Sequence, residues 1–157
     1  MKSFIGIGVA VGVLAGIWTQ VSLELTLITW VAFVSWATFF AAGGGKDGFV
    51  KGLAANLSGV AWAYLASLFL AANTWNGAVA IAVTVLGVVL CLQAAVPVLS
   101  FIPGAFVGTA VFFGTSFDLL GTVVALVAGA CLGFVSALLA AKIQAAVDGA
   151  PMAEQTA

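Results

Sequence analysis

Residues 77–95 have the sequence GAVAIAVTVLGVVLCLQAA, which contains no charged side chain. A helix rises about 1.5 Å per residue and the hydrocarbon core of a bilayer is about 30 Å thick, so one crossing takes about 20 apolar residues. The stretch has that length, and it lies within a charge-free window, residues 52–117, that has room for about three crossings. It therefore predicts a chain that crosses a membrane as helices.

The rest of the chain has the same character. Of its 157 residues, 64% are hydrophobic and 6% are charged, too few charges to solvate the surface of a water-soluble domain. The charge-free windows 3–23, 25–45 and 119–141 each fit one crossing. None alternates apolar and polar residues as the strands of a membrane barrel do. We therefore predict an all-α, polytopic transmembrane helix bundle of about six membrane segments, at residues 4–21, 24–42, 52–72, 77–95, 99–116 and 119–144.

This interpretation assigns residues 1–145 to a single integral membrane domain and residues 146–157 to a disordered cytoplasmic tail. Cytoplasmic loops collect positive charge, and six crossings put all four lysines and both termini on that side: Lys2, Lys46, Lys51 and Lys142. Segment 96–116 contains Pro97 and Pro103, so it is either a full crossing or a broken or re-entrant helix. In the second case the C-terminus lies outside.

A short pattern occurs twice, at corresponding places. Residues 36–42, WATFFAA, end the second predicted segment, and residues 109–115, TAVFFGT, end the fifth. Both contain an alanine, two phenylalanines and a small residue in the same order. Because three segments are an odd number, a repeat of three places its second copy upside down in the membrane. The echo favours a 3+3 inverted repeat, from which many channels and transporters build a path through the bilayer.

The absent residue types argue against catalysis and ion coupling. The chain has no histidine and no arginine, and its two cysteines, Cys91 and Cys131, lie far apart in apolar windows. A Ser-His-Asp or Cys-His arrangement is therefore impossible, and a metal site has almost no ligands to draw on. The net charge of −1 and the lack of a basic patch argue against nucleic acid. We expect no enzyme activity and no cofactor, metal or nucleic-acid partner.

Asn56 is the polar residue that stands out in the predicted interior. An amide is costly in hydrocarbon unless it is paired, so it should point into the bundle, on a helix face shared with Gly59 and Ala63. Two interpretations stay open. The amide either lines a path for a neutral solute or forms an interhelical hydrogen bond that holds the bundle together.

Aromatic rings and a proline–glycine step complete the candidate path. Hydrophobic constrictions gate a pore by dewetting, and a helix broken at Pro103-Gly104 is tolerated at membrane depth only inside protein or along a cavity. Packing in the core or against lipid is the alternative for each ring. The pore or solute-lining candidates are Trp36, Phe39, Asn56, Trp62, Phe101, Pro103, Gly104, Phe106 and Phe112.

Glycines recur at a spacing of four residues, which places them on one helix face. Such faces let helix backbones approach closely in lipid. They serve packing within the chain or between copies, and we expect a homo-oligomer. The helix-packing candidates are Gly8, Gly12, Gly16, Gly104, Gly108, Gly129 and Gly133.

Residues 36–44, Asn56 and residues 101–108 together resemble the YcdZ-like bacterial inner-membrane proteins, a family that carries domain of unknown function 1097. The resemblance covers about residues 3–145. It implies an integral, multi-pass place in the bacterial inner membrane and one compact domain, and it implies no substrate.

The charge-free interior favours a passive channel or facilitator for a small uncharged solute, such as urea, ammonia, a short alcohol or an undissociated acid. The alternative is a non-transporting membrane subunit or scaffold that packs against partner membrane proteins, since the glycine faces fit it equally well. In either case the chain lies in the lipid bilayer.

Overall fold

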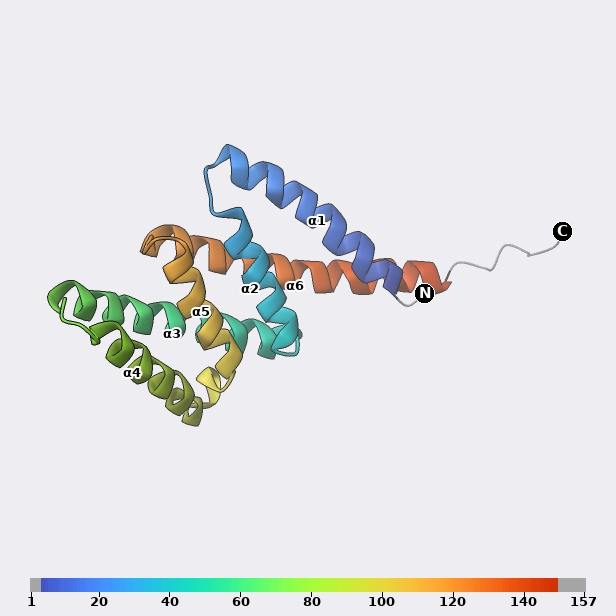
Figure 1. The fold of residues 1–157 in the computed structure, drawn as a ribbon. Coiled ribbons are helices and arrows are strands. Elements are labelled where there is room, and N and C mark those ends of the chain that lie inside the picture. Colours follow the sequence, from blue (N-terminus) through green and yellow to red (C-terminus); the bar gives the residue numbers. More distant parts are fainter. Residues whose placement is uncertain (1–3, 150–157) are drawn as a thin grey trace.

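The computed structural model describes residues 4–149, and every regular element in this range is helical (Figure 1). The α-helices are α1 (Ile5–Glu24), α2 (Thr29–Ala41), α3 (Gly45–Ala72), α4 (Ala78–Leu92), α5 (Ile102–Gly114) and α6 (Leu119–Gly149). Two 3-10 turns, η2 (Gln93–Ala95) and η3 (Pro97–Leu99), connect α4 to α5. The prediction of an all-α membrane helix bundle is confirmed, with six α-helices in this range.

The helices fall into two length classes. α1, α3, α6 and the continuous Ala78–Ala95 segment are long and apolar enough to cross a membrane. α2 and α5 have 13 residues each, which makes about 20 Å of helix, less than the hydrocarbon core of about 30 Å. The broken character predicted for segment 96–116 is therefore present, and α2 shares it, since it begins only at Thr29.

The break in that segment lies elsewhere than expected. Pro103 is in the first turn of α5, where its missing N–H has no intrahelical partner to lose. The chain is instead interrupted at Val96, whose extended backbone (φ −90°, ψ 119°) separates η2 from η3. A residue before proline favours this conformation. Pro97 therefore ends the preceding helix and Pro103 begins the next, which corrects the expectation of a break at Pro103-Gly104.

The α2–α3 and α5–α6 turns are built in the same way. In each, three successive amides donate back to carbonyls of the preceding helix, at 2.9–3.0 Å in the first turn and 2.9–3.1 Å in the second. Gly44 closes the first turn on Phe39, and Phe117 closes the second on Phe112. Each donor and acceptor of the second turn lies 73 positions after its counterpart, the same separation as between the two sequence patterns. The sequence echo is therefore a structural repeat.

The two halves of the chain, α1–α3 and α4–α6, are interlocked. α2 packs against α6 and α5 packs against α3, so each short helix lies on the long central helix of the other half. α1 packs against α6, and α4 packs against α3, at the periphery. Corresponding helices of the two halves run in opposite directions in Figure 1. This arrangement is consistent with the 3+3 inverted repeat that the sequence pattern favours.

Close backbone contacts join the halves at equivalent positions. A Cβ added at Gly129 of α6 would overlap the carbonyl of Ala32 on α2, and one added at Gly59 of α3 would overlap the carbonyl of Ala105 on α5. Glycines at such crossings let helices gain packing contacts in lipid, where burial of apolar surface gives little driving force.

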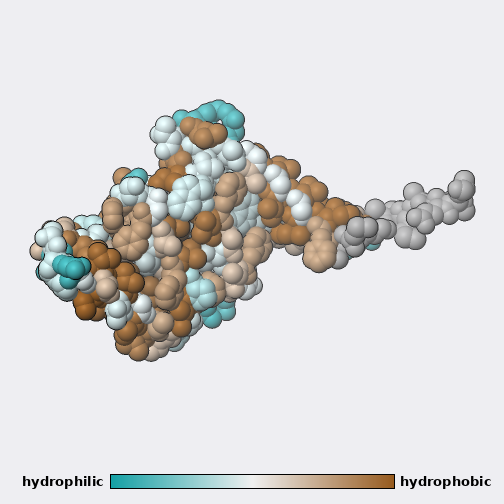
Figure 2. All heavy atoms as spheres, in the orientation of Figure 1, coloured by the Kyte–Doolittle hydropathy of each residue, from teal (hydrophilic) through white to brown (hydrophobic). Residues whose placement is uncertain are grey.

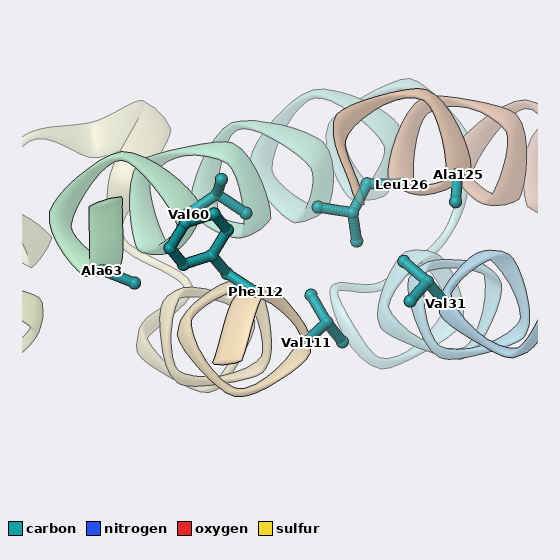
Figure 3. Packing of buried hydrophobic residues seen from close by; sticks show 7 residues of the cluster. All are labelled: Val31, Val60, Ala63, Val111, Phe112, Ala125 and Leu126. Atoms are coloured by element: carbon teal, nitrogen blue, oxygen red, sulfur yellow. The ribbon is translucent and has the colours of Figure 1, made fainter. Parts of the chain in front are cut away.

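The core lies where α2, α3, α5 and α6 meet. Its members are 3% exposed or less, and they are Val31, Val60, Ala63, Val111, Phe112, Ala125 and Leu126. Figure 3 shows the Phe112 ring of α5 reaching toward α3 beside Val60.

The exterior is apolar except near helix ends. Large hydrophobic side chains are exposed along α1, α3, α4 and α6, and Figure 2 shows strongly hydrophilic residues at the α1–α2 and α3–α4 connections. α3 starts at Gly45 rather than at the predicted residue 52, so Lys46 and Lys51 lie in its first two turns. α6 continues to Gly149, so residues 146–149 of the predicted tail are helical. The remainder of that tail lies outside the described residues.

Candidate functional site

A buried polar cluster lies where the two halves cross. Asn56 of α3 is 0% exposed and Ser35 of α2 is 1% exposed. The Asn56 Nδ2 atom donates to the Ser35 hydroxyl oxygen at 3.3 Å, and this hydroxyl donates to the Leu126 carbonyl of α6 at 2.6 Å. Helices from both halves thus share one chain of hydrogen bonds inside the apolar core.

The orientation of the Asn56 amide follows from Ser35. A hydroxyl carries one proton, and the Ser35 proton is used on the Leu126 carbonyl. Ser35 can therefore only accept from Asn56, which turns the NH₂ end of the amide toward it. The Asn56 Oδ1 oxygen is buried and has no hydrogen-bond partner among residues 4–149. An unpaired buried acceptor is costly, so this oxygen is a candidate position for a ligand that donates a hydrogen bond.

α5 crosses α3 directly at Asn56. A Cβ added at Gly108 would overlap the Asn56 carbonyl, and one added at Gly104 would lie 2.9 Å from Ala55 Cβ. One residue after Gly108, the Thr109 hydroxyl donates to the Gly59 carbonyl at 3.1 Å. These glycines allow the helix to approach Asn56 as closely as it does.

Three aromatic candidates are buried beside this crossing. Trp36 is 3% exposed, and its Nε1 atom donates to the Ser136 hydroxyl at 2.9 Å. Phe39 is 1% exposed and packs on α6, where a Cβ added at Gly133 would lie 2.7 Å from its ring. Phe112 is 0% exposed and packs on α3. Phe39 follows Ser35 by one helical turn and Phe112 follows Gly108 by one turn, in helices that run in opposite directions.

The other lining candidates lie nearer the surface of the chain. Trp62 is 37% exposed and Phe106 is 46% exposed. Pro103 is exposed, and Phe101 is partly exposed and covers Gly104. The structure therefore gathers Asn56, Trp36 and the first phenylalanine of each repeated pattern, Phe39 and Phe112, in the interior. It leaves Trp62 and most of the 101–106 stretch at the periphery.

A groove between α3 and α4 was not predicted. Its volume is about 300 Å³, and apolar side chains of both helices line it. Trp62 forms part of its wall and donates through Nε1 to the Gln93 Oε1 atom at 3.0 Å. The available signal was the row of large residues on the outer face of α3, Trp62, Leu65 and Phe69. The groove lies away from Asn56, which is not among its lining residues.

The predicted glycine faces divide into two groups. Four glycines pack against other helices or side chains within the chain: Gly104, Gly108, Gly129 and Gly133. The other three would bring an added Cβ within 4 Å of nothing outside their own helix: Gly8, Gly12 and Gly16. We call the face of α1 that carries these three glycines the α1 glycine face. No other helix of the described residues packs against it.

Ser35 is the site residue that the sequence analysis missed. A hydroxyl in an apolar helix usually bonds to its own backbone, so Ser35 gave no signal by itself. The signal was its place four residues before Phe39, on the helix face that the repeated pattern buries. A buried amide on a neighbouring helix needs such a partner.

The chemistry available at this site is hydrogen bonding in an apolar setting. Among residues 4–149, no group of histidine, cysteine, aspartate and glutamate side chains could hold a metal ion. The charged residues of this range lie near helix ends. The interior offers one amide oxygen to a ligand and no group that titrates near neutral pH.

Residues 8–141 match the family model described as a protein of unknown function, DUF1097. The chain is 36% identical to Uncharacterized protein YahC of Escherichia coli K12, over 87% of this chain and 90% of the relative. It is 32% identical to Inner membrane protein YcdZ of the same organism, over 75% of this chain and 74% of the relative. Inner membrane protein YcdZ of Salmonella typhimurium is 30% identical, over 75% of each chain. No solved structure is detectably similar.

The long apolar helices and the inner-membrane relatives support a location in the bacterial inner membrane. The family match covers most of the chain, including all of α3 with Asn56 and α6 as far as residue 141. The resemblance seen in the sequence is confirmed: the chain belongs to the DUF1097 family and is a multi-pass membrane protein.

Proposed function

We propose that this protein is a passive facilitator for small uncharged solutes, which cross the membrane between its two halves and past Asn56. The observation that carries the proposal is the unpartnered Oδ1 oxygen of this fully buried amide. Transporters built from inverted repeats place their substrate sites near the bilayer midplane, at the interface between the repeats. Asn56 lies at such an interface, since α2 and α5, one from each half, meet α3 around it.

The interior suits an uncharged cargo. Among residues 4–149, the buried polar residues are hydroxyls and one amide: Ser22, Ser35, Thr38, Asn56, Thr109, Thr122 and Ser136. An ion would lose its hydration here without meeting an opposite charge, a cost of at least several kcal/mol. A neutral molecule loses only hydrogen bonds, and Asn56 can replace one of them.

Phe39 and Phe112 are the gates in this proposal. They lie one turn beyond the crossing on helices of opposite direction, and so on opposite sides of Asn56. Both rings are buried, so the described conformation is the closed one. A solute passes when the rings turn aside, and hydrophobic constrictions of this kind close by excluding water.

Stopped-flow light scattering from proteoliposomes tests the proposal. After a hyperosmotic step with urea, acetamide, glycerol or acetic acid, liposomes that contain the protein should re-swell several-fold faster than protein-free liposomes for at least one solute. Liposomes with an unrelated helical membrane protein at the same density control for leakage at the protein–lipid boundary. Rates equal to the controls for every solute would contradict the proposal.

The remaining parts of the proposal concern assembly and orientation. We place both termini on the cytoplasmic side, because the lysines then lie where positive charge collects. The α1 glycine face would join copies in a homo-oligomer, since it has no neighbour in the single chain. Each copy would keep its own path, because Asn56 is enclosed by helices of one chain.

A non-transporting membrane subunit is the second candidate function. The same open α1 glycine face favours it, because a helix of another protein could occupy that face equally well. Purification in a mild detergent separates the two. A homogeneous homo-oligomer supports the facilitator, whereas a stoichiometric foreign membrane protein that is released by Gly12→Leu supports the subunit.

A further inference from the structure

The buried hydroxyl groups around the crossing have no proton left to give. Each donates to a backbone carbonyl: Ser35 to Leu126, Thr38 to Val34, Thr109 to Gly59 and Ser136 to Gly133. The Trp36 N–H is used on the Ser136 hydroxyl. The Asn56 NH₂ group is turned toward Ser35. The hydroxyl and indole protons at this crossing are therefore all used. The Asn56 NH₂ group uses one of its two N–H donors on Ser35, and the Asn56 Oδ1 oxygen is free as an acceptor.

The other half of the chain does not supply a donor at the equivalent place. Gly129 meets Ala32 as Gly59 meets Ala105, so Ala32 of α2 corresponds to Ala105 of α5 and Gly129 of α6 corresponds to Gly59 of α3. The same register matches Ser35 with Gly108 and Asn56 with Leu126. Gly108 has no side chain, and the Leu126 side chain is part of the hydrophobic core. The repeat interface thus presents one acceptor in an apolar wall.

We infer that the solute is a hydrogen-bond donor, a small neutral molecule with an N–H or O–H group such as urea, a primary amide or ammonia, which binds through that group to the Asn56 Oδ1 oxygen. This inference rests on the proposed facilitator function. A solute that only accepts hydrogen bonds can pair with the second Asn56 N–H alone and leaves the Oδ1 oxygen unpaired, whereas urea or a primary amide can pair with both and so makes one hydrogen bond more. One lost hydrogen bond corresponds to roughly a tenfold difference in rate between the two kinds of solute.

The test measures re-swelling rates of proteoliposomes, each corrected for the rate of protein-free liposomes. It compares acetamide and urea, which donate hydrogen bonds, with dimethyl sulfoxide, which only accepts them. Wild-type protein should accelerate the donors roughly tenfold more than dimethyl sulfoxide. Asn56→Leu, which installs the residue found at the equivalent position of α6, should remove this preference. Ser35→Ala takes away the acceptor that orients the amide, so the amide can turn and its NH₂ group can serve an acceptor solute. The Ser35→Ala variant should therefore show a smaller preference for donor solutes over dimethyl sulfoxide than the wild type. Thr38→Val, whose hydroxyl bonds within its own helix, is the matched control and should keep it.

The outcomes separate this inference from the function on which it rests. Equal acceleration of all three solutes, or a preference that persists in both Asn56→Leu and Ser35→Ala, would overturn the donor assignment and leave the facilitator intact. No acceleration of any solute would overturn both. If Asn56→Leu does not yield folded protein, Ser35→Ala decides: an unchanged preference in that variant contradicts the inference.

Discussion

The two halves of this chain share an arrangement of helices and differ in what they place at the crossing. In the first half, α2 contributes Ser35 and α3 contributes Asn56, joined by a hydrogen bond. In the second half the matching positions hold Gly108 and Leu126. The backbone contacts on the two sides are nevertheless equivalent, since Gly129 meets the Ala32 carbonyl as Gly59 meets the Ala105 carbonyl. The repeat accounts for the fold, and the departure from it accounts for the site.

The turns differ between the halves in the same manner. Gly43 and Gly44 have φ values of 102° and 67°, which glycine adopts easily. Ser116 and Phe117 adopt 55° and 70° at the matching places, where a side chain is strained. The Phe117 ring packs against Phe112 at a centroid distance of 5.7 Å. The turn of the second half thus combines a strained backbone with aromatic packing beside the core.

The largest loss of stability is expected from variants that disrupt the helix crossing in either half. Gly59→Leu and Gly129→Leu each force a side chain into the backbone of the opposing short helix. We expect both to lose about 3 kcal/mol or more and to give little folded protein. Yield of monodisperse protein and the thermal midpoint in detergent measure this. Gly12→Leu, where an added Cβ meets nothing, should change monomer stability by less than about 0.5 kcal/mol. Tolerance of either crossing variant would contradict the equivalence of the halves.

The phenylalanines that fill equivalent places should be equally important. Phe39→Ala and Phe112→Ala each leave a cavity at a fully buried position, and we expect each to cost about 3 kcal/mol. Denaturation monitored by tryptophan fluorescence compares them. The exposed Phe106 provides the control, because Phe106→Ala should cost less than about 1 kcal/mol. A large cost for one core variant with none for the other would show that the halves pack differently.

Exchanging the residues that distinguish the halves should have effects of opposite sign. Asn56→Leu removes an unpaired buried acceptor and should leave stability unchanged or raise it by about 1 kcal/mol. Leu126→Asn buries a second amide in the hydrophobic core and should lower stability by about 2 kcal/mol. Thermal midpoints of the two variants check the signs. A loss in Asn56→Leu as large as in Leu126→Asn would make the Asn56–Ser35 bond a structural link and weaken the case for a binding position.

The smallest expected effect lies in the turns. Ser116→Gly relieves a left-handed residue and should raise stability by roughly 0.5–1 kcal/mol, whereas Gly43→Ser should lower it by a similar amount. The shifts of the thermal midpoint should therefore be small and opposite. Two shifts of the same sign would show that the turns are less alike than their hydrogen bonds indicate.

The sequence predicted most of the fold because membrane residence fixes helix length and leaves charges at helix ends. The repeat was visible in the FF pattern because the first ring of each pair, Phe39 or Phe112, is buried in the core. The short α2 was not visible, because residues 25–28 contain neither proline nor glycine. The Ser22 and Thr29 hydroxyls, 2.6 Å apart, join the two sides of this break, which no local pattern indicates. The position of Pro103 was misread, since a proline in the first turn of a helix and one in its middle differ only in where the helix starts.

The site was predictable in part, for a similar reason. Asn56 was identified because a lone amide in an apolar segment must be buried or paired. Its partner Ser35 and its free oxygen depend on how α2 and α6 meet, which no local pattern encodes. Trp62 and Phe106 have the composition of pore residues, but their exposure depends on which helix face turns outward.

The inverted repeat is the central claim, and the sidedness of its two turns tests it most directly. In a background without Cys91 and Cys131, single cysteines replace the exposed residues Lys46 and Asp118, which follow the α2–α3 and α5–α6 turns. A membrane-impermeant thiol reagent is then applied to intact cells and to permeabilised cells. We predict that one cysteine reacts in intact cells and the other only after permeabilisation. Reaction of both cysteines from the same side would contradict the inverted arrangement and the account of the site that depends on it.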